Sequence, residues 1–169
     1  MTGADGFAGR WLCRDLVDSG FEVSGWVHRS VEHPILGVSY RMQDIRDGEG
    51  VRRSMVQDAP DRVFHLAAES HVDRSIDAPT KFIQTNVVGT LNLLNESNEW
   101  LKNLDGIKKD SFRFIHISTD EVYGSLEKKG KFVETTPYDP SSPYSASKAS
   151  SDHLTRSWFK TFNFPIMIT

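Results

Sequence analysis

A short polar stretch follows an apolar run in the second half of the chain. The run reads FRFIHI and the stretch Ser118–Gly124 reads STDEVYG. It sets the hydroxyl of Thr119 beside the carboxyl groups of Asp120 and Glu121, where the pattern predicts the end of a buried strand. Adjacent carboxyl groups in unequal environments can supply one acid and one base. The alternative interpretation is a simple polar start of a loop.

A tyrosine and a lysine stand four residues apart in the later segment YSASK. Tyr144 and Lys148 therefore share one face if this segment is helical. A tyrosine has an ordinary pKa of about 10, and a nearby ammonium group lowers that pKa, so the pair predicts a tyrosine that transfers protons. Small residues between the two leave room for a cofactor, whose nicotinamide ribose Lys148 can bind. Such pairs also occur by chance in many helices.

A glycine-rich turn opens the chain. In TGADGFAG three glycines recur at every third position, before an apolar pattern of helical period. Such glycines let backbone N–H groups approach a pyrophosphate at a helix N-terminus, so the turn predicts a dinucleotide site. Glycine-rich helix starts are common, and the spacing alone is weak. The turn comprises Gly3, Gly6, Phe7 and Gly9.

Two later strand ends bear on the choice of dinucleotide. An NAD site usually has an acidic residue after its second strand, but here Arg29 and Ser30 follow His28. They can hold a 2′-phosphate, which favours NADP, although Arg29 can equally be a solvated loop charge. After the third strand, Asp44 can accept from an adenine amine and Ile45 can pack on the base.

Apolar strand-like runs alternate with helical patterns along the whole chain. This alternation predicts one domain over 1–169, an α/β doubly wound parallel sheet of Rossmann type. Only Met1 and Thr2 precede the glycine turn, so we expect the first strand to be missing, and we expect the chain to be one lobe of a larger protein or a deletion product. The expected helices are 9–20, 48–59, 79–101 and 143–162, and the expected strands are 21–28, 38–43, 61–68, 112–118 and 164–169.

Composition narrows the class of protein. A net charge of -3, with 38% hydrophobic and 25% charged residues, is ordinary for a globular protein and gives no reason to expect nucleic acid. No apolar run approaches the roughly 20 residues of a membrane span. A single cysteine, Cys13, fits a reducing cytoplasmic location, and scattered histidines predict no metal site.

Taken in order, the motifs resemble those of the extended short-chain dehydrogenase/reductases. Within that group the chain is most similar to the dTDP-glucose 4,6-dehydratases. HLAAESHVDRS and the pair Asp120-Glu121 are the more specific parts, because the glycine turn and the Tyr-Lys pair are shared by the whole superfamily. The motifs that carry the resemblance are TGADGFAG, HLAAESHVDRSI, TNVVGT, STDEVYG and PYSASKASSDHL.

The resemblance implies a dehydration without net oxidation of a nucleotide-sugar. Tyr144 would take the proton of the sugar 4-hydroxyl, which Thr119 helps to place, while a hydride leaves C4. Glu121 would remove the C5 proton and protonated Asp120 would donate to the departing C6 hydroxyl. Lys148 would support the cofactor and Tyr144.

Further positions are implied in the same way. Leu66, Ala67 and Thr85 should line the cofactor, and Ser70 should contact the sugar nucleotide. The helices 79–101 and 143–162 should pack against those of a second copy in a homodimer. His71, Asp73 and Arg74 follow in the same string, where a structural role is at least as good an explanation.

The chain also departs from the pattern of the dehydratases. His28-Arg29-Ser30 in place of an acidic residue leaves NAD against NADP open, and the C-terminal substrate lobe is absent. Two other functions stay open at this point. One is a related nucleotide-sugar epimerase or decarboxylase, and the other is a non-catalytic, truncated dinucleotide-binding module.

Overall fold

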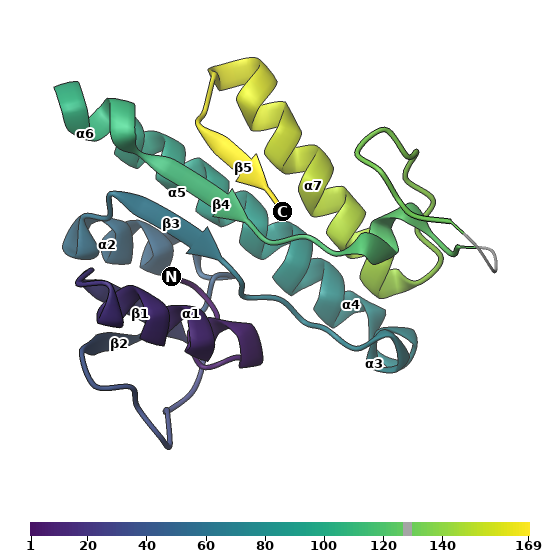
Figure 1. Cartoon of the computed structure of the whole chain (residues 1–169), viewed down its shortest axis with the longest axis horizontal. Helices are drawn as coiled ribbons and strands as arrows, with labels where there is room; N and C mark the ends of the chain where they lie inside the picture. The colour runs from purple at the N-terminus through teal and green to yellow at the C-terminus, as the bar shows by residue number, and fades with distance from the viewer. Residues whose placement is uncertain (127–129) are drawn as a thin grey trace.

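The computed structural model describes residues 1–126 and 130–169. In this part of the chain the strands run parallel, with helices on both faces of the sheet (Figure 1). One pair has the order β1-β2 and the other strands have the order β3-β4-β5. The strands are β1 (Val23–Val27), β2 (Val38–Met42), β3 (Arg62–His65), β4 (Arg113–His116) and β5 (Ile166–Ile168). The α/β doubly wound prediction is confirmed.

The first residues of the chain join the two strand groups. Thr2 forms parallel bridges to Trp26 of β1 and to His65 of β3. Its N–H donates to the carbonyl of Phe64 at 2.9 Å, and the carbonyl of Met1 accepts from Trp26 at 2.7 Å. The expectation of a missing first strand is confirmed, because within residues 1–6 no strand precedes α1 and only the isolated bridges of Thr2 hold its place between β1 and β3.

The helices divide between the two faces of the sheet. Helix α1 (Phe7–Asp18) contributes Cys13 to one core cluster, together with Val23 and Val27 of β1. Trp26 of β1 belongs to the other cluster, and its indole N–H donates to Asp58 of α2. Because side chains alternate along a strand, these two sets lie on opposite faces. The helices α2 (Gly48–Asp58), α5 (Thr90–Lys102) and α7 (Pro143–Phe162) cover the second face.

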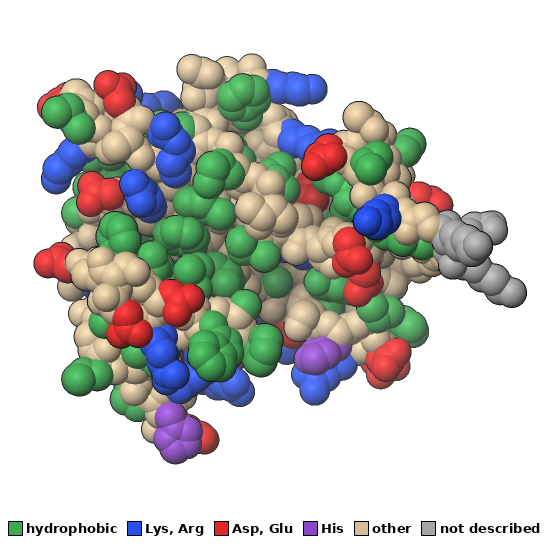
Figure 2. Space-filling view, viewed as in Figure 1, with side chains coloured by type: hydrophobic (Ala, Val, Ile, Leu, Met, Phe, Trp, Pro, Cys, Tyr) green, Lys and Arg blue, Asp and Glu red, His purple; other side chains and the backbone are tan. Residues whose placement is uncertain are grey.

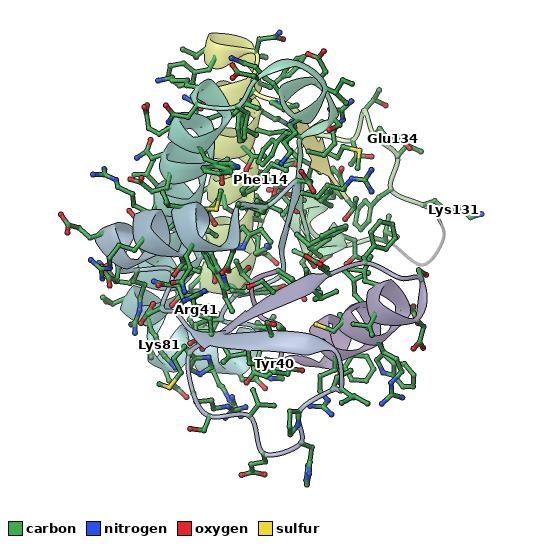
Figure 3. The ribbon with its side chains drawn as sticks, turned by 90° about the vertical axis from the view of Figure 1, so that its left-hand side faces the viewer. Tyr40, Arg41, Lys81, Phe114, Lys131 and Glu134 are labelled. Atoms are coloured by element: carbon green, nitrogen blue, oxygen red, sulfur yellow. The ribbon has the colours of Figure 1, made fainter. Side chains whose placement is uncertain are left out.

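The larger core cluster is rich in aromatic side chains. Phe114 of β4 is fully buried and lies in the interior (Figure 3). Its ring is 5.8 Å from that of Phe164 and 6.1 Å from that of His65, measured between centroids. On the face of the sheet opposite this cluster, hydrophobic side chains gather at the centre of the molecular surface (Figure 2). No helix in the described residues combines the length and apolar character that crossing a membrane requires.

The segment expected to be one long helix is divided into three. It consists of α4 (Pro79–Phe82), a π-helix η1 (Ile83–Gly89) and α5. Asn86, inside the π-helix, uses its side chain to bind the backbone of Glu69 and the hydroxyl of Ser147. A π-helical turn changes the direction in which its side chains point. Here it directs the side chain of Asn86 toward these two partners.

Helix α7 agrees with its predicted bounds because both of its ends carry strong signals. Ser142 forms a capping box with Ser145, Pro143 takes the first helical position, and Asn163 closes the helix in the left-handed conformation. The helical pattern did not predict three shorter elements. These are α3 (Val72–Asp77), α6 (Gly106–Ser111) and the 3-10 turn η2 (Asp120–Tyr123).

The glycine turn gives a test of the fold. A Cβ added at Gly9 would overlap the carbonyl oxygen of Gly3, which is backbone and cannot move aside without opening the turn. We predict that Gly9→Ala lowers the free energy of unfolding by about 3 kcal/mol. In the matched control Gly48→Ala, the new methyl would meet only Asn92 at 3.4 Å, and the change should stay within about 0.5 kcal/mol. Urea unfolding of both variants is the measurement, and equal midpoints would contradict the prediction.

Candidate active site

The glycine turn lies where the topology of the sheet changes direction. From residues 1–4 the chain runs through α1 to β1 and β2, and α2 then returns it to β3 on the other side of Thr2. In open α/β sheets, ligands bind at such switch points, outside the carboxyl ends of the strands. Gly3 packs so closely on the exit of β3 that a Cβ there would stand 2.8 Å from the backbone nitrogen of Ala67. The turn and the β3 exit therefore form one surface.

Other predicted residues of the dinucleotide site surround this turn. Gly6 caps α1 without a side chain, and Phe7 is 88% exposed next to it. The guanidinium of Arg29, on a side chain that is 72% exposed, lies 3.3 Å from the carboxylate of Asp5 in the glycine turn. Arg29 therefore reaches the edge of the turn but already has an acidic partner there.

The pair after β2 is divided between surface and core. Both carboxylate oxygens of Asp44 accept from Arg46, and this hydrogen bond is the main reason that the pKa of Asp44 is lowered. Ile45 is 4% exposed and packs in the larger core cluster, against Gly89 of the π-helix. Asp44 thus lies at the surface but is already paired with Arg46, whereas the side chain of Ile45 is covered by protein.

The exit of β3 is fixed from two sides. The N–H of Ala67, beside Leu66, donates to the hydroxyl of Thr2 at 3.0 Å. Asn86 then bonds to both the N–H and the carbonyl of Glu69, at 2.8 and 3.0 Å. Its neighbour Thr85 is half-buried, and Ser70 is exposed just before α3.

The three polar residues after β4 begin the η2 turn. Thr119 is its N-cap, and its hydroxyl accepts from the N–H of Glu121 at 3.3 Å. The same hydroxyl lies 3.5 Å from the carboxylate of Asp120. This stretch is therefore the start of a loop, and it also places a hydroxyl group and two carboxyl groups close together.

Helix α7 brings Tyr144 to this cluster and Lys148 beneath it. Burial raises the pKa of Tyr144, the carboxylates of Glu121 and Asp120 raise it further, and a hydrogen bond with Thr119 opposes them. Lys148 is 5% exposed and donates to the carbonyl of Ile117 at 2.5 Å. The structure therefore brings together all five predicted catalytic residues.

The pKa values of the pair both depart from their ordinary values. Burial lowers the pKa of Lys148 to about 8, with the charge of Asp152 opposing that change. The expectation that Lys148 lowers the pKa of Tyr144 together with a bound nicotinamide stays a prediction, and in the chain by itself the pKa of Tyr144 is raised. The ammonium group is bound to Ile117, while burial and two neighbouring carboxylates disfavour the phenolate.

Two further polar residues of this region were not singled out from the sequence. Asn86 ties the β3 exit to Ser147 of α7, and Asp152 lies fully buried behind Lys148. Asp152 follows Lys148 at the same interval that separates Lys148 from Tyr144, and this repeat was a usable signal. Within residues 1–126 and 130–169, no cluster of three His, Cys, Asp or Glu side chains is arranged to hold a metal ion.

Comparison with known proteins identifies the family. The sequence pattern of the family described as GDP-mannose 4,6 dehydratase matches residues 1–169. The chain belongs to this family. It is 57% identical over 126 residues to dTDP-glucose 4,6-dehydratase of Xanthomonas campestris pv. campestris (strain B100), covering 75% of this chain and 36% of that protein. It is 45% identical to dTDP-glucose 4,6-dehydratase 1 of Escherichia coli K12, covering 100% of this chain and 52% of the relative.

Solved structures of a dehydratase and of an epimerase have a fold similar to that of this chain. DesIV, a dTDP-glucose 4,6-dehydratase from Streptomyces venezuelae with NAD and TYD bound, matches with a TM-score of 0.84 and 33% identity, over 99% of this chain and 53% of its own. The UDP-glucose 4-epimerase of Thermus thermophilus, in complex with NAD, matches with a TM-score of 0.87 and 29% identity, over 99% and 52%. The resemblance to dTDP-glucose 4,6-dehydratases is confirmed, and the chain spans about half the length of these proteins.

The raised pKa of Tyr144 can be tested directly. Because the carboxylate of Glu121 contributes to it, Glu121→Gln should lower the pKa of Tyr144 toward its ordinary value. Ultraviolet titration of the phenolate band measures this, and Tyr144→Phe identifies the signal by subtraction. Asp139→Asn, which changes an exposed carboxylate of the following loop, is the matched control and should leave the midpoint in place. An unchanged midpoint in Glu121→Gln would exclude a charge effect.

Proposed function

We propose that the whole protein containing this chain is a nucleotide-sugar 4,6-dehydratase that converts dTDP-glucose to a 4-keto-6-deoxy sugar. The observation that carries the proposal is the group of Thr119, Asp120 and Glu121 against Tyr144, in which an acid, a base and a hydroxyl share one site. The relatives named dTDP-glucose 4,6-dehydratase support the choice of reaction and sugar nucleotide.

The described residues supply the proton transfers of such a reaction. Tyr144 accepts the proton of the sugar 4-hydroxyl, and Thr119, which lies close enough to influence the phenol of Tyr144, orients that hydroxyl. The ketone formed at C4 acidifies the C5 proton, which Glu121 removes. Asp120 in its protonated form donates to the departing C6 hydroxyl, so elimination of water has one acid and one base at neighbouring carbons.

The residues around the glycine turn fit a nicotinamide dinucleotide. The close contact of Gly3 with Ala67 keeps side chains out of the turn, and the N-terminus of α1 opens beside it. Gly6, Gly9 and Asp44 would hold the pyrophosphate and adenosine parts, with Thr85 and Lys148 nearer the nicotinamide. Bound in oxidised form, this cofactor would supply a hydride acceptor for C4 and, once reduced, a hydride donor for C6, while Glu121 would return its proton to C5. Its positive charge would favour the phenolate of Tyr144.

We propose NAD rather than NADP as this cofactor. The structures with NAD bound support this choice. The pairing of Arg29 with Asp5 supports it as well, because a 2′-phosphate would have to compete with that carboxylate. Arg29-Ser30 remains the feature that favours NADP. The cytoplasmic location expected from the single cysteine stays a prediction.

A second function is a nucleotide-sugar 4-epimerase. It is favoured by the fold match to the Thermus thermophilus epimerase, which shares the Rossmann lobe. The two reactions differ in what they require of this site. Elimination of the C6 hydroxyl needs an acid at Asp120, whereas inversion at C4 does not.

Substitution of Asp120 tests the proposed function. In the whole protein, Asp120→Asn should lower formation of the 4-keto-6-deoxy sugar from dTDP-glucose by at least about 10²-fold, because the C6 hydroxyl loses its proton donor. Asp139→Asn changes an exposed carboxylate of the loop that follows η2 and should leave the rate near that of the wild type. Each protein is assayed with a panel of sugar nucleotides and with NAD and NADP in turn.

Two results of this assay would decide against the proposal. One is wild-type protein that forms no dehydrated product from any sugar nucleotide with either cofactor. The other is an Asp120→Asn variant that retains full activity. Inversion at C4 in both proteins would establish the epimerase instead.

We also propose a homodimer that packs through the helices 79–101 and 143–162. Support comes from apolar side chains that these helices expose, with Ile83 at 44% and Phe162 at 50%. Ile83→Glu should shift the protein from dimer to monomer in sedimentation velocity, because it would bury a charge between subunits. Ile107→Glu is the control, since Ile107 is 86% exposed on α6, outside these helices. A dimer that is unaffected by Ile83→Glu would contradict this arrangement.

A further inference from the structure

A third polar side chain, that of Asp152, follows Tyr144 and Lys148 along one face of α7. Asp152 stands one further turn from Lys148 at the same interval, and the solvent reaches none of its surface. A buried carboxylate is costly unless other groups pair with it. The partners of Asp152 therefore indicate what it does.

Those partners come from two segments that carry the active site. The hydroxyl of Ser118, the residue before Thr119, donates to Oδ2 of Asp152 at 2.5 Å. The hydroxyl of Tyr138, in the loop that follows the catalytic turn, donates to the same oxygen at 2.8 Å. The other oxygen, Oδ1, lies 3.1 Å from Nε2 of His116. One carboxylate thus ties α7 to the end of β4 and to the loop after it.

The hydrogen bonds keep this carboxylate charged. Burial acts to raise the pKa of Asp152, but the neighbouring ring of His116 and hydrogen bonds from Ser118 and Tyr138 outweigh burial and the pKa is lowered. Burial holds the pKa of His116 below its ordinary value, so its ring is mostly neutral at neutral pH. The charge of Asp152 is therefore not cancelled by the histidine beside it.

The groups around Lys148 leave Asp152 as its compensating charge. On the β3 side, His65 has a pKa that burial lowers strongly, and His116 of β4 behaves in the same way, so neither ring is a cation there at neutral pH. Tyr144, on α7 itself, has a raised pKa and carries no charge. The charge that opposes the effect of burial on Lys148 is that of Asp152.

Two more carboxyl groups belong to this environment. Asp120 and Glu121 of η2 lie close enough to Tyr144 to influence its phenol. Their effect is on the hydroxyl of Tyr144 rather than on the ammonium group of Lys148, which points to the carbonyl of Ile117. The two ends of the Tyr-Lys pair therefore face different carboxylates.

We propose that Asp152 is a positioning residue of the active site: its buried carboxylate fixes the end of β4 that carries Thr119 and holds Lys148 as an ammonium ion. The importance of that ion for turnover rests on the proposed function, whereas its dependence on Asp152 does not. Asp152 touches neither substrate nor cofactor in this role. It acts through Ser118 and Lys148.

Titration of Lys148 in the protein without ligands tests this dependence. Carbon-13 labelling of the lysine side chains gives a resonance for each lysine, and Lys148→Met assigns the one of interest. The wild-type midpoint is expected at about 8. In Asp152→Asn the midpoint should move to lower pH, because the ammonium ion stays buried and loses its opposite charge.

Two further variants keep the test decisive. Asp152→Glu retains the charge and should keep the midpoint close to the wild-type value. Tyr138→Phe leaves Asp152 in place but removes a donor that shares its charge, so the midpoint should move to higher pH. Circular dichroism reports whether each variant is folded. An unchanged midpoint in folded Asp152→Asn, or in Tyr138→Phe where Asp152→Asn does not fold, overturns the proposal.

A pH profile then separates positioning from a merely structural role. In the whole protein, the alkaline limb of product formation should move to lower pH in Asp152→Asn, in step with the lysine midpoint. Loss of structure alone would reduce the rate by the same factor at every pH and would count against the proposal. If the wild type forms no product at all, the proposed function fails, while the lysine titration still decides the role of Asp152.

Discussion

The attachment of α7 to the carboxyl end of β4 is the constraint on which the site depends. Two buried charged side chains make it, because Lys148 donates to the carbonyl of Ile117 and Asp152 accepts from Ser118. A buried charge without partners is costly, so the helix can sit on the strand only where both are satisfied. In that position Tyr144 reaches Thr119, and the η2 turn begins where the strand ends.

A second buried polar layer extends this constraint to the glycine turn and the end of β3. The ring of His65 lies 2.9 Å from the hydroxyls of both Thr2 and Thr90, and Thr90 donates to the carbonyl of Asn86. Asn86 then reaches Ser147 of α7. Each such bond contributes only about 1 kcal/mol net, but leaving one of these groups unpaired costs about 1–3 kcal/mol. The layer therefore specifies one arrangement of turn, strand and helix more than it adds stability.

Burial has opposite consequences for the two members of the Tyr-Lys pair. It lowers the pKa of Lys148 to about 8 and raises the pKa of Tyr144, so in each case it favours the uncharged form. A site that needs an ammonium ion and a phenolate must therefore supply charge from elsewhere. Asp152 supplies the negative charge for Lys148. For Tyr144, the positive charge that would favour the phenolate has to come from what binds at the glycine turn.

Much of this molecule was set by local sequence. The alternation of apolar runs and helical patterns predicted the parallel α/β fold, and the caps at Ser142 and Asn163 fixed α7 to its residues. The places of the five residues proposed as catalytic, Thr119 to Lys148, could also be predicted, because spacing along one element and the end of one strand are local properties. The π-helix, the place of Thr2 in the sheet and the pKa of Tyr144 could not be predicted. The π-helix depends on the contact of Asn86 with Glu69, and the place of Thr2 depends on Phe64 and Trp26 on either side of it. The pKa of Tyr144 depends on which carboxylates lie near its phenol. Burial and charge at a site are sums over neighbours that are distant in the chain, and only the tertiary structure decides which neighbours those are.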